Sequence, residues 1–422
     1  MISNIDLILE KLFSLQRLGI KVGLEHTEEF LYKIGNPHKK LKCIHIAGTN
    51  GKGSTCAILN KILIEHGFSV GLYTSPHLVK FNERIQINGE QISDMAIVEF
   101  MENNSEHIKN LKTTFFETTT AMAFDYFFKQ SVDIAIIETG LGGRLDSTNV
   151  ISPEVCGISS ISLDHMEILG ESIEKISKEK AGIIKEKTPI VTFDQGESII
   201  GVIKETAEAI NAPLTIIKYK DIDMIKINDQ SSSFRYKKYK INLPLKGEHQ
   251  IINCLLAIKI TEIILDRIDM DIMTNAINNS YWPGRMEKLS DNDIYYDVAH
   301  NYDGIRAMIE AAIKYHPQKG LIGLFCIKGD KNISSICNLL RENFHKIIIC
   351  QDKEKYLLSV GELSKIMNNK KINYLSAISV KDGLNILENI KKEGFVGLVF
   401  GSHYIAEEVY SEFGKHFDTT YN

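Results

Sequence analysis

An apolar segment that runs into a glycine-rich turn constrains the fold of this chain more than any other feature. Residues 44–55 read IHIAGTNGKGST, and residues 54–66 carry apolar side chains at helical spacing before Gly67. A strand, a tight turn and a helix in this order are typical of a parallel sheet covered by helices on both faces. Backbone N–H groups at such a turn and at the start of the helix also form a cradle for phosphate.

The spacing inside this turn differs from the usual phosphate loop, G-x-x-x-x-G-K-[ST], because Gly53 separates Lys52 from Ser54. The lysine can still supply charge to the β- and γ-phosphates of ATP, and Ser54 or Thr55 can offer a hydroxyl to Mg²⁺. The alternative is a tight strand–helix turn with an exposed lysine, but the glycines, the lysine and the hydroxyls together favour phosphate. The predicted ATP-binding residues of this loop are Gly48, Thr49, Asn50, Gly51, Lys52, Gly53, Ser54 and Thr55.

The rest of the chain repeats the alternation of apolar strands and amphipathic helices. An opening helix is predicted around residues 5–12, and residues 214–245 are short, alternating and polar, which predicts antiparallel strands beside the main sheet. Pro283 and Gly284 mark a boundary, after which the alternation starts again. Further strands are predicted at 68–75, 132–143, 155–162 and 188–193, and helices at about 172–185 and 249–264.

These patterns predict an α/β chain of two domains, as its 422 residues allow. Residues 1–286 are predicted to form an ATP-binding domain of the P-loop type. It would hold a large, mostly parallel sheet with flanking helices and a small antiparallel side sheet. Residues 287–422 are predicted to form a smaller, Rossmann-like α/β domain.

Charge and composition exclude several classes of protein. The net charge of −5 gives no overall field that favours nucleic acid or a membrane. The basic stretch RYKKYK at 235–240 is better explained as a solvated strand at a sheet edge than as a nucleic-acid site. No apolar run has membrane-spanning length, and the N-terminus lacks the regions of a signal peptide. Seven scattered cysteines without a C-x-x-C pair indicate free thiols, so we expect a cytoplasmic protein.

Acidic and imidazole side chains follow two of the predicted strands. Glu138 ends the run DIAIIE, at the strand end where ligands of open α/β sheets gather. Mg²⁺ needs carboxylate and other oxygen ligands close to the phosphates, so Glu138 is a candidate metal ligand rather than only a capping acid. Asp164 and His165 follow another strand, and this pair by itself is compatible with a structural role.

These segments together resemble the folylpolyglutamate synthase and dihydrofolate synthase family, which belongs to the Mur ligase superfamily. The resemblance extends from about residue 18 to residue 410. The matching segments are GNPHKKLKCIHIAGTNGKGST, YTSPHLVKFNERIQING, FFETTTAMAF, ETGLGGRLDSTN, LDHMEILGESIEKISKEKAGIIK, GEHQIINCLLAI and WPGRME. So many motifs in the same order are highly specific to one family.

The resemblance implies roles for residues that chemistry alone does not single out. Lys52 would hold the phosphates, Asn253 would meet the adenine, and Arg285 would reach the γ-phosphate. Lys180 would be carbamylated and would act as an acid near a metal. By its residue type alone, Lys180 would be read as a solvated lysine on a helix. The family's metal ligands match Ser75 and Glu138 for one Mg²⁺ and His165 for a second metal.

The second domain matches the family with departures. DVAHNYDG (297–304) resembles D-G-A-H-N-P-x-G, and CIKGDKN (326–332) resembles an element that ends in an acid where this chain has Asn332. The resemblance implies that Asp297 and His300 act at the ATP and glutamate end of the site. We expect Ser402 rather than His403 to act near the glutamate, because we expect this histidine at the surface. Candidate substrate-binding residues are Phe81, Arg84, His300 and Ser402.

The implied enzyme is an ATP-dependent ligase of folate biosynthesis and one-carbon metabolism. ATP would convert the substrate carboxylate into an acyl phosphate, which the amine of L-glutamate would then attack. The acceptor stays open between dihydropteroate and a reduced folate, and we favour an enzyme that uses both. The resemblance implies a monomer. Rival interpretations are another amide ligase of the Mur superfamily and a nucleotide-binding regulator without ligase chemistry.

Overall fold

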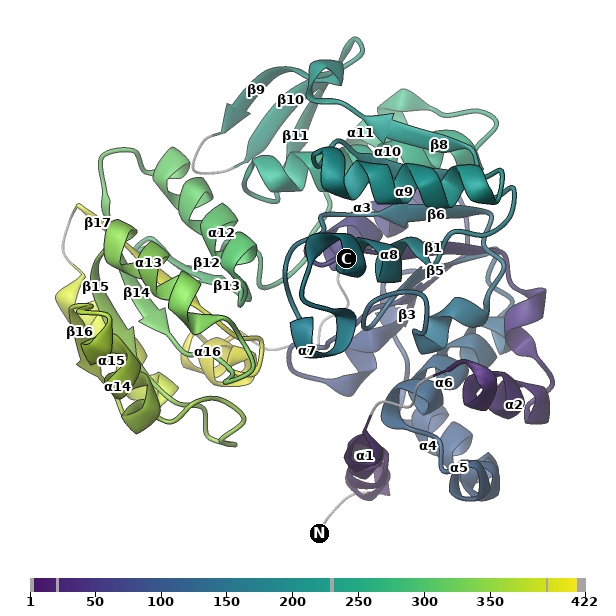
Figure 1. The fold of residues 1–422 in the computed structure, drawn as a ribbon, viewed down its shortest axis with the longest axis horizontal. Coiled ribbons are helices and arrows are strands. Elements are labelled where there is room, and N and C mark those ends of the chain that lie inside the picture. The colour runs from purple at the N-terminus through teal and green to yellow at the C-terminus, as the bar shows by residue number, and fades with distance from the viewer. Residues whose placement is uncertain (1–3, 20–22, 228–230, 392–393, 416–422) are drawn as a thin grey trace.

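The structure is a computed structural model that describes residues 4–19, 23–227, 231–391 and 394–415. Figure 1 shows two lobes side by side, the larger built from the N-terminal part of the chain and the smaller from the C-terminal part. Each lobe contains its own mostly parallel sheet with helices on both faces. This confirms the predicted fold class. None of the described helices is long and apolar enough to span a lipid bilayer.

The larger lobe is organised around an eight-stranded sheet. The six strands from β2 to β8 across the sheet run parallel to one another. In the described sheet, only β3 and β4 at one edge are antiparallel to their neighbours. The central strands β1 and β5 are buried at every position, as their apolar sequence predicts. In order across the sheet, the strands are β4 (Glu90–Gln91), β3 (Ile85–Ile87), β2 (Val70–Tyr73), β5 (Ile134–Glu138), β1 (Cys43–Ala47), β6 (Val155–Ile158), β7 (Ile190–Phe193) and β8 (Leu214–Ile217).

The predicted side sheet begins later than the sequence pattern indicated. Residues 214–217 form β8, which pairs parallel with β7 at the edge of the large sheet, so their assignment to antiparallel strands was wrong. An edge strand has solvent on one side, and its alternating, half-buried pattern resembles that of an antiparallel strand. The small antiparallel sheet is formed by β9 (Asp223–Ile227), β10 (Ser232–Tyr236) and β11 (Tyr239–Leu243).

Helices cover both faces of the large sheet. On one face α3, α10, α11 and the small sheet enclose a core with β1 and β5. On the other face α1, α2, α4 and α6 cover one half of the sheet, and α8 and α9 cover the half around β6 and β7. The helices are α1 (Asn4–Ser14), α2 (Glu25–Lys33), α3 (Lys52–Glu65), α4 (Asp94–Asn103), α5 (Ser105–Leu111), α6 (Phe115–Lys129), α7 (Met166–Leu169), α8 (Ile173–Ala181), α9 (Glu197–Ala209), α10 (Glu248–Ile264) and α11 (Met270–Asn278). Short 3₁₀ helices are η1 (Leu15–Leu18), η2 (Pro37–Lys40), η3 (Phe81–Arg84), η4 (Ser147–Val150) and η5 (Tyr219–Asp221).

The smaller lobe has a six-stranded sheet with α12, α13 and α14 on one face and α15 and α16 on the other. Only its edge strand β12 is antiparallel. Across the sheet the strands are β12 (Glu287–Ser290), β13 (Ile294–Asp297), β17 (Phe395–Phe400), β14 (Gly320–Phe325), β15 (Phe344–Ile349) and β16 (Tyr374–Ser376). The helices are α12 (Tyr302–Tyr315), α13 (Ile333–Asn343), α14 (Val360–Asn369), α15 (Val380–Ile390) and α16 (Ala406–Glu412).

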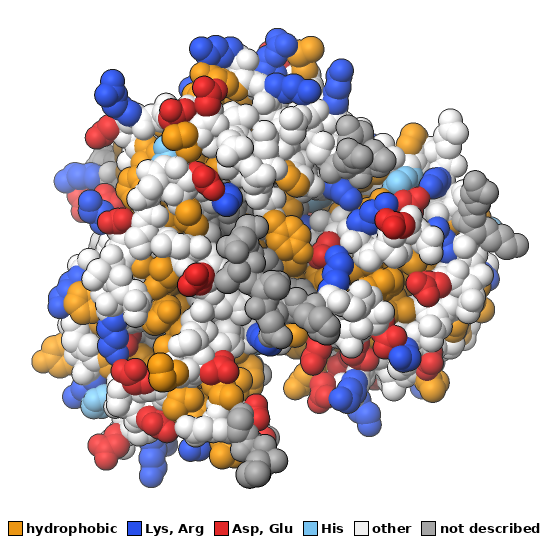
Figure 2. Space-filling view, turned by 180° about the vertical axis from the view of Figure 1, so that it is seen from behind, with side chains coloured by type: hydrophobic (Ala, Val, Ile, Leu, Met, Phe, Trp, Pro, Cys, Tyr) orange, Lys and Arg blue, Asp and Glu red, His pale blue; other side chains and the backbone are white. Residues whose placement is uncertain are grey.

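The two lobes meet through polar contacts, a short linker and an apolar contact in which Leu78 and Val79 of the larger lobe pack against the core of the smaller lobe. The hydroxyl of Tyr315 on α12 accepts a hydrogen bond from the Gly247 N–H at 2.8 Å, and the ammonium of Lys246 lies 4.5 Å from the Tyr295 ring centre. Viewed from behind, a notch separates the lobes at the lower edge, and charges of both signs are interspersed over the face (Figure 2). Two lobes joined by a linker and a mixed interface of this kind can move relative to each other.

Candidate active site

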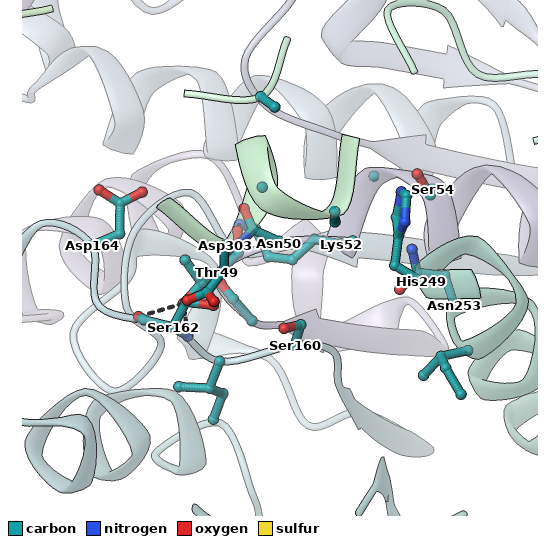
Figure 3. A pocket seen from close by; sticks show the side chains of 18 of the residues that line it. Thr49, Asn50, Lys52, Ser54, Ser160, Ser162, Asp164, His249, Asn253 and Asp303 are labelled. Carbon is teal, nitrogen blue, oxygen red and sulfur yellow. Dashed lines mark hydrogen bonds between the residues drawn. The ribbon is translucent and has the colours of Figure 1, made fainter. Parts of the chain in front are cut away.

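The glycine-rich loop forms the floor of a large cavity between the lobes. The loop joins β1 to α3, and both Gly48 and Gly51 have positive φ. A side chain on Gly51 would place its Cβ 2.3 Å from the Asn253 amide oxygen on α10, so this position requires glycine. The cavity has a volume of about 540 Å³. Figure 3 shows it extending from Asp164 at one end to His249 and Asn253 at the other.

Two buried lysines converge on the carbonyl of Gly48. Lys180 on α8 donates to this carbonyl at 2.7 Å, and Lys52 donates to it at 3.2 Å. Burial, with a smaller contribution from Lys52, lowers the pKa of Lys180 to about 7. Lys180 is therefore not the solvated lysine that its residue type alone would indicate. Its side chain is buried inside the phosphate site, with a substantial neutral fraction near neutral pH.

Glu138 lies at the end of β5, directly across from the loop. One carboxylate oxygen is 3.9 Å from the Lys52 ammonium, and the other accepts the Ser75 backbone N–H at 3.2 Å. Burial raises the pKa of Glu138 to about 7, against the opposing effect of Lys52. The hydroxyls of Ser54 and Thr55 are buried nearby and make no hydrogen bond to the described residues. These hydroxyl oxygens therefore have no hydrogen-bond partner among the described residues and are free to bind a ligand.

The far end of the cavity is suited to a flat, partly apolar group. Asn253 is buried on α10 and donates to the Gln250 side chain at 3.0 Å, while His249 lies one turn earlier (Figure 3). Burial, with Arg285 second, lowers the pKa of His249 to about 4, so its ring is neutral at neutral pH. Phe193 and Ile199 supply apolar lining, and Gln195 adds an amide.

The linker between the lobes positions Arg285 at the edge of the cavity. Its neighbour Met286 donates its N–H to Asp297 at 2.9 Å, and the Ala299 N–H donates to the other oxygen at 2.8 Å. Both oxygens of Asp297 are thus engaged by backbone groups, and this carboxylate ties the linker to β13. Within the described residues, the Arg285 side chain hydrogen-bonds only to the neighbouring Gly284 carbonyl, at 2.9 Å.

Asp164 and His165 lie at the opposite end, where residues of both lobes meet. Lys331 of the smaller lobe donates to Asp164 at 2.7 Å and lies 3.5 Å from the His165 ring nitrogen. Burial alone would raise the pKa of the Asp164 carboxyl, but Lys331 and His300 hold it below its usual range. Burial lowers the pKa of His165 to about 4, so its ring is neutral and able to bind a metal.

Three residues of the smaller lobe gather beside this junction. His300 donates its Nδ1–H to the Val298 carbonyl at 2.9 Å, which leaves Nε2 unprotonated in the neutral ring. Burial lowers the pKa of His300, so this neutral form is favoured. Ser402 is buried, and its hydroxyl accepts the Tyr404 N–H at 3.1 Å. His403 is half-buried rather than at the surface, with its ring centre 6.5 Å from that of His300.

An aromatic group surrounds Arg84 beneath the cavity. Phe81 lies within an aromatic cluster with Phe13, His77 and Phe115, whose ring centres are 5.6–6.4 Å apart where they contact. The Arg84 guanidinium lies 5.1 Å from the Phe115 ring and donates to His77 at 2.7 Å. One of its terminal nitrogens is buried without a hydrogen-bond partner among the described residues. A buried guanidinium in this state is a receptor for an anion.

Comparison with known proteins assigns the chain to a family. Residues 46–261 match the Mur ligase middle domain, and residues 284–403 match the Mur ligase glutamate ligase domain. The dihydrofolate synthase/folylpolyglutamate synthase of Bacillus subtilis is 33% identical over 414 residues, which cover 93% of this chain and 95% of that protein. The chain belongs to the folylpolyglutamate synthase family of Mur ligases. It is therefore an ATP-dependent ligase.

Solved structures of the family have the same architecture. Folylpolyglutamate synthase of Mycobacterium tuberculosis, complexed with ADP and AMPPCP, superposes with a TM-score of 0.90 at 25% identity. That alignment covers 98% of this chain and 100% of the other. The E. coli FolC complex with DHPP and ADP gives a TM-score of 0.84 at 26% identity, over 96% of this chain and 97% of that chain. The nucleotides in these complexes support ATP as the cofactor of the family.

The structure places most of the predicted residues around this cavity. Fifteen of those predictions line it together with Asp164, whereas Thr55 of the loop does not line it. Phe81 and Arg84 lie in the aromatic cluster instead, and Ser402 is buried in the smaller lobe next in sequence to His403, whose ring centre is 6.5 Å from that of His300. Among the residues that the sequence did not single out, Asn301 and Lys331 stand out because they contact the other lobe. The predicted residues on the cavity wall are Gly48, Thr49, Asn50, Gly51, Lys52, Gly53, Ser54, Ser75, Glu138, His165, Lys180, Asn253, Arg285, Asp297 and His300.

Proposed function

We propose that this ligase joins the amine of L-glutamate to the carboxyl group of a folate or pteroate, with ATP as the energy source. The observation that supports this most directly is the arrangement of the cavity. The phosphate loop of the larger lobe and His300 of the smaller lobe line the same space. A nucleotide and a second substrate could therefore meet between the lobes, away from bulk water.

In the proposed first step the acceptor carboxylate attacks the γ-phosphorus of ATP. The bond from that phosphorus to the bridging oxygen breaks, and ADP and an acyl phosphate result. Lys52 at the loop and Arg285 at the linker would bind the charge that spreads over the phosphoryl oxygens. Asp297 would act indirectly, since both of its oxygens hold backbone groups of the linker and β13.

The residues present fit Mg²⁺, which we propose as the metal at two positions. The described chain has no cluster of three or more His, Cys, Asp and Glu side chains arranged for a metal. Mg²⁺ beside a nucleotide needs only one or two protein carboxylates, and phosphates and water complete its coordination. Ser75 and Glu138 would hold one ion and His165 the other. When bound, Mg²⁺ would neutralise phosphate charge and orient the γ-phosphoryl group.

Carbamylation of Lys180 is a further part of this proposal. A neutral lysine amine attacks carbon dioxide, forms an N–C bond and releases a proton, which leaves an anionic carbamate. The burial that lowers the pKa of Lys180 to about 7 favours the neutral amine that this reaction needs. A carbamate here would also replace the repulsion between two neighbouring cations, Lys180 and Lys52, with attraction.

In the second step we assign His300 the role of general base. The glutamate amine must lose a proton as it attacks the acyl carbon and inorganic phosphate leaves. His300 has a free Nε2 lone pair because its Nδ1–H is held by the Val298 carbonyl. Ser402, buried beside it, would bind the incoming amino acid through its hydroxyl.

Arg84 and Phe81 are the proposed contacts of the acceptor. The partnerless nitrogen of Arg84 suits the acceptor's carboxylate, and the surrounding rings suit its planar aromatic part. Either dihydropteroate or a reduced folate carries both groups, and we propose that both are used. We also propose a cytoplasmic monomer, which seven free, buried cysteines support.

Product mass tests this function directly. The enzyme is incubated with Mg-ATP and L-glutamate, with dihydropteroate in one tube and tetrahydrofolate in another. A gain of one glutamate on the first acceptor and of one or more on the second is the expected result. The Lys52→Ala variant is the matched control, since it should give neither product. No gain on either acceptor, while ATP is still hydrolysed, would refute the acceptor assignment but not the nucleotide site.

A further inference from the structure

We infer that Asn301 is a positioning residue that clasps the smaller lobe to the phosphate loop, with Asp164 and Lys331 as the second half of the clasp. This inference rests on the proposed function only for its enzymatic readouts, because the clasp itself is a set of contacts between lobes. Its residues are Asn50 and Asp164 of the larger lobe and Asn301 and Lys331 of the smaller lobe.

The contacts of the clasp are short, specific and reciprocal. Asn50 and Asn301 exchange two hydrogen bonds between their side-chain amides, at 3.1 and 3.0 Å. The amide nitrogen of Asn301 also donates to one oxygen of Asp164 at 3.0 Å. The other oxygen accepts the Lys331 ammonium at 2.7 Å, and both of these charged side chains are only 8% exposed. A charge-assisted pair so well shielded from water is stronger than a surface pair.

Both halves of the clasp are fixed within their own lobes. In the larger lobe the Thr49 hydroxyl accepts the Ser162 N–H at 3.0 Å, and the Ser159 hydroxyl donates to the Asn50 carbonyl at 2.9 Å. These bonds join the phosphate loop to the segment that carries Asp164, as the dashed line between Thr49 and Ser162 shows in Figure 3. Any shift of the loop on binding phosphate is therefore passed to Asp164.

In the smaller lobe the clasp adjoins the proposed general base. Asn301 caps α12 by accepting the Gly304 N–H at 2.9 Å, and it directly follows His300. Lys331 lies in the loop before α13, which Asn332 caps by accepting the Ser335 N–H. Closing the clasp thus sets the position of His300 relative to the phosphates. An entirely polar contact is suited to this task, because its groups can separate and be hydrated again in each turnover.

The sharpest test exchanges the donor and acceptor between Asp164 and Asn301. Asn301→Asp keeps the helix cap but sets one carboxylate against another, so it should open the clasp. Asp164→Asn in the same chain removes that repulsion and restores a donor–acceptor pair. Lys331→Met removes the ion pair alone. Lys328→Met is the matched control, because Lys328 lies on the same loop, is exposed, and within the described residues pairs only with Asp330.

Asn301→Asp should raise the KM for L-glutamate about tenfold, because loss of one hydrogen bond to a charged group changes an equilibrium constant by roughly a factor of ten. Phosphate release should exceed amide formation, because an acyl phosphate formed without a closed smaller lobe is exposed to water. Small-angle scattering with Mg-ADP should show a larger radius of gyration than for the wild-type chain. The double variant should recover part of both losses, because it restores a donor–acceptor pair between positions 164 and 301 but lacks the ion pair with Lys331, and Lys328→Met should change neither.

The two hypotheses have distinguishable failures. If the wild-type chain adds glutamate but Asn301→Asp keeps the wild-type scattering profile and the wild-type ratio of phosphate to amide, the clasp is refuted. If the double variant has a normal melting temperature but shows no better KM or scattering profile than Asn301→Asp, the pairing of Asp164 with Asn301 is also refuted. If neither acceptor gains glutamate but Asn301→Asp expands the protein and the double variant reverses this, the clasp stands and the proposed function fails.

Discussion

Replacing Glu138 by glutamine should stabilise the folded protein above pH 7 and abolish its ligase activity. The carboxyl is 3% exposed, and burial raises its pKa to about 7 from the ordinary 4.5. The folded chain therefore holds this proton more tightly than the unfolded chain. As a result, the free energy of unfolding falls as the pH rises from about 4.5 to 7. Glutamine has nearly the same shape and does not ionise, so it avoids this loss.

The size of the effect follows from the shift in proton affinity. A tenfold change in affinity corresponds to about 1.4 kcal/mol, so ionised Glu138 lowers the free energy of unfolding by about 3 kcal/mol at pH 8. At pH 5 the same difference is less than about 1 kcal/mol, because Glu138 is then largely protonated when folded. At pH 8 the substitution should raise the melting temperature by about 6 °C for a lobe of this size.

The assay is urea unfolding of the wild-type and variant proteins at pH 5 and pH 8, without nucleotide and with a chelator present. Glu262→Gln provides a control of opposite sign. Burial alone would raise the pKa of Glu262, but hydrogen bonds from Lys237 and Lys259 hold it below its ordinary value. Glu262→Gln should therefore destabilise the protein at pH 8. The reasoning would be refuted if the difference in unfolding free energy between Glu138→Gln and wild type were the same at pH 5 and pH 8.

Three further substitutions test the site. Lys52→Ala should lower kcat at least ~10³-fold with an unchanged circular dichroism spectrum, since it removes charge from the γ-phosphate; near-normal turnover would contradict this. Lys180→Ala should lose activity that acetate or another short carboxylate partly restores, and an unmodified Lys180 ammonium in a well-resolved crystallographic map of the active site would argue against carbamylation. Arg84→Met should raise the KM for the acceptor about tenfold and leave the KM for ATP unchanged; equal changes in both would disprove an acceptor contact.

Local patterns in the sequence were sufficient to predict the glycine-rich loop between β1 and α3 and most of the fold. Glu138 ends the apolar strand β5, and Lys52 begins α3, directly after the turn that follows the apolar strand β1. The carboxyl ends of neighbouring parallel strands meet at one edge of the sheet, so the two side chains come together there. The edge strand at 214–217 was misassigned, because its alternation reflects solvent on one side rather than antiparallel pairing. Burial of Lys180 could not be derived from its helix, whose other lysines face outward.

Contacts between distant segments were beyond the reach of any local pattern. Asn301 and Asp164 are 137 positions apart, and neither residue type signals its partner. Asn332 was treated as a departure from an acidic motif, yet its amide oxygen caps α13 as a carboxylate would. His403 was expected at the surface because isolated histidines usually are, and only the packing of Tyr404 and His300 around it shows otherwise.

The seven cysteines have a practical consequence for studying this enzyme. All of them are buried and unpaired, so the native chain offers thiol reagents no accessible target in the folded state. Met95 in the larger lobe is 78% exposed and Ile378 in the smaller lobe is 81% exposed. A cysteine introduced at each of these two positions could be labelled with a fluorophore without first removing any native thiol. Energy transfer between the two dyes would then report the separation of the lobes in single molecules during turnover.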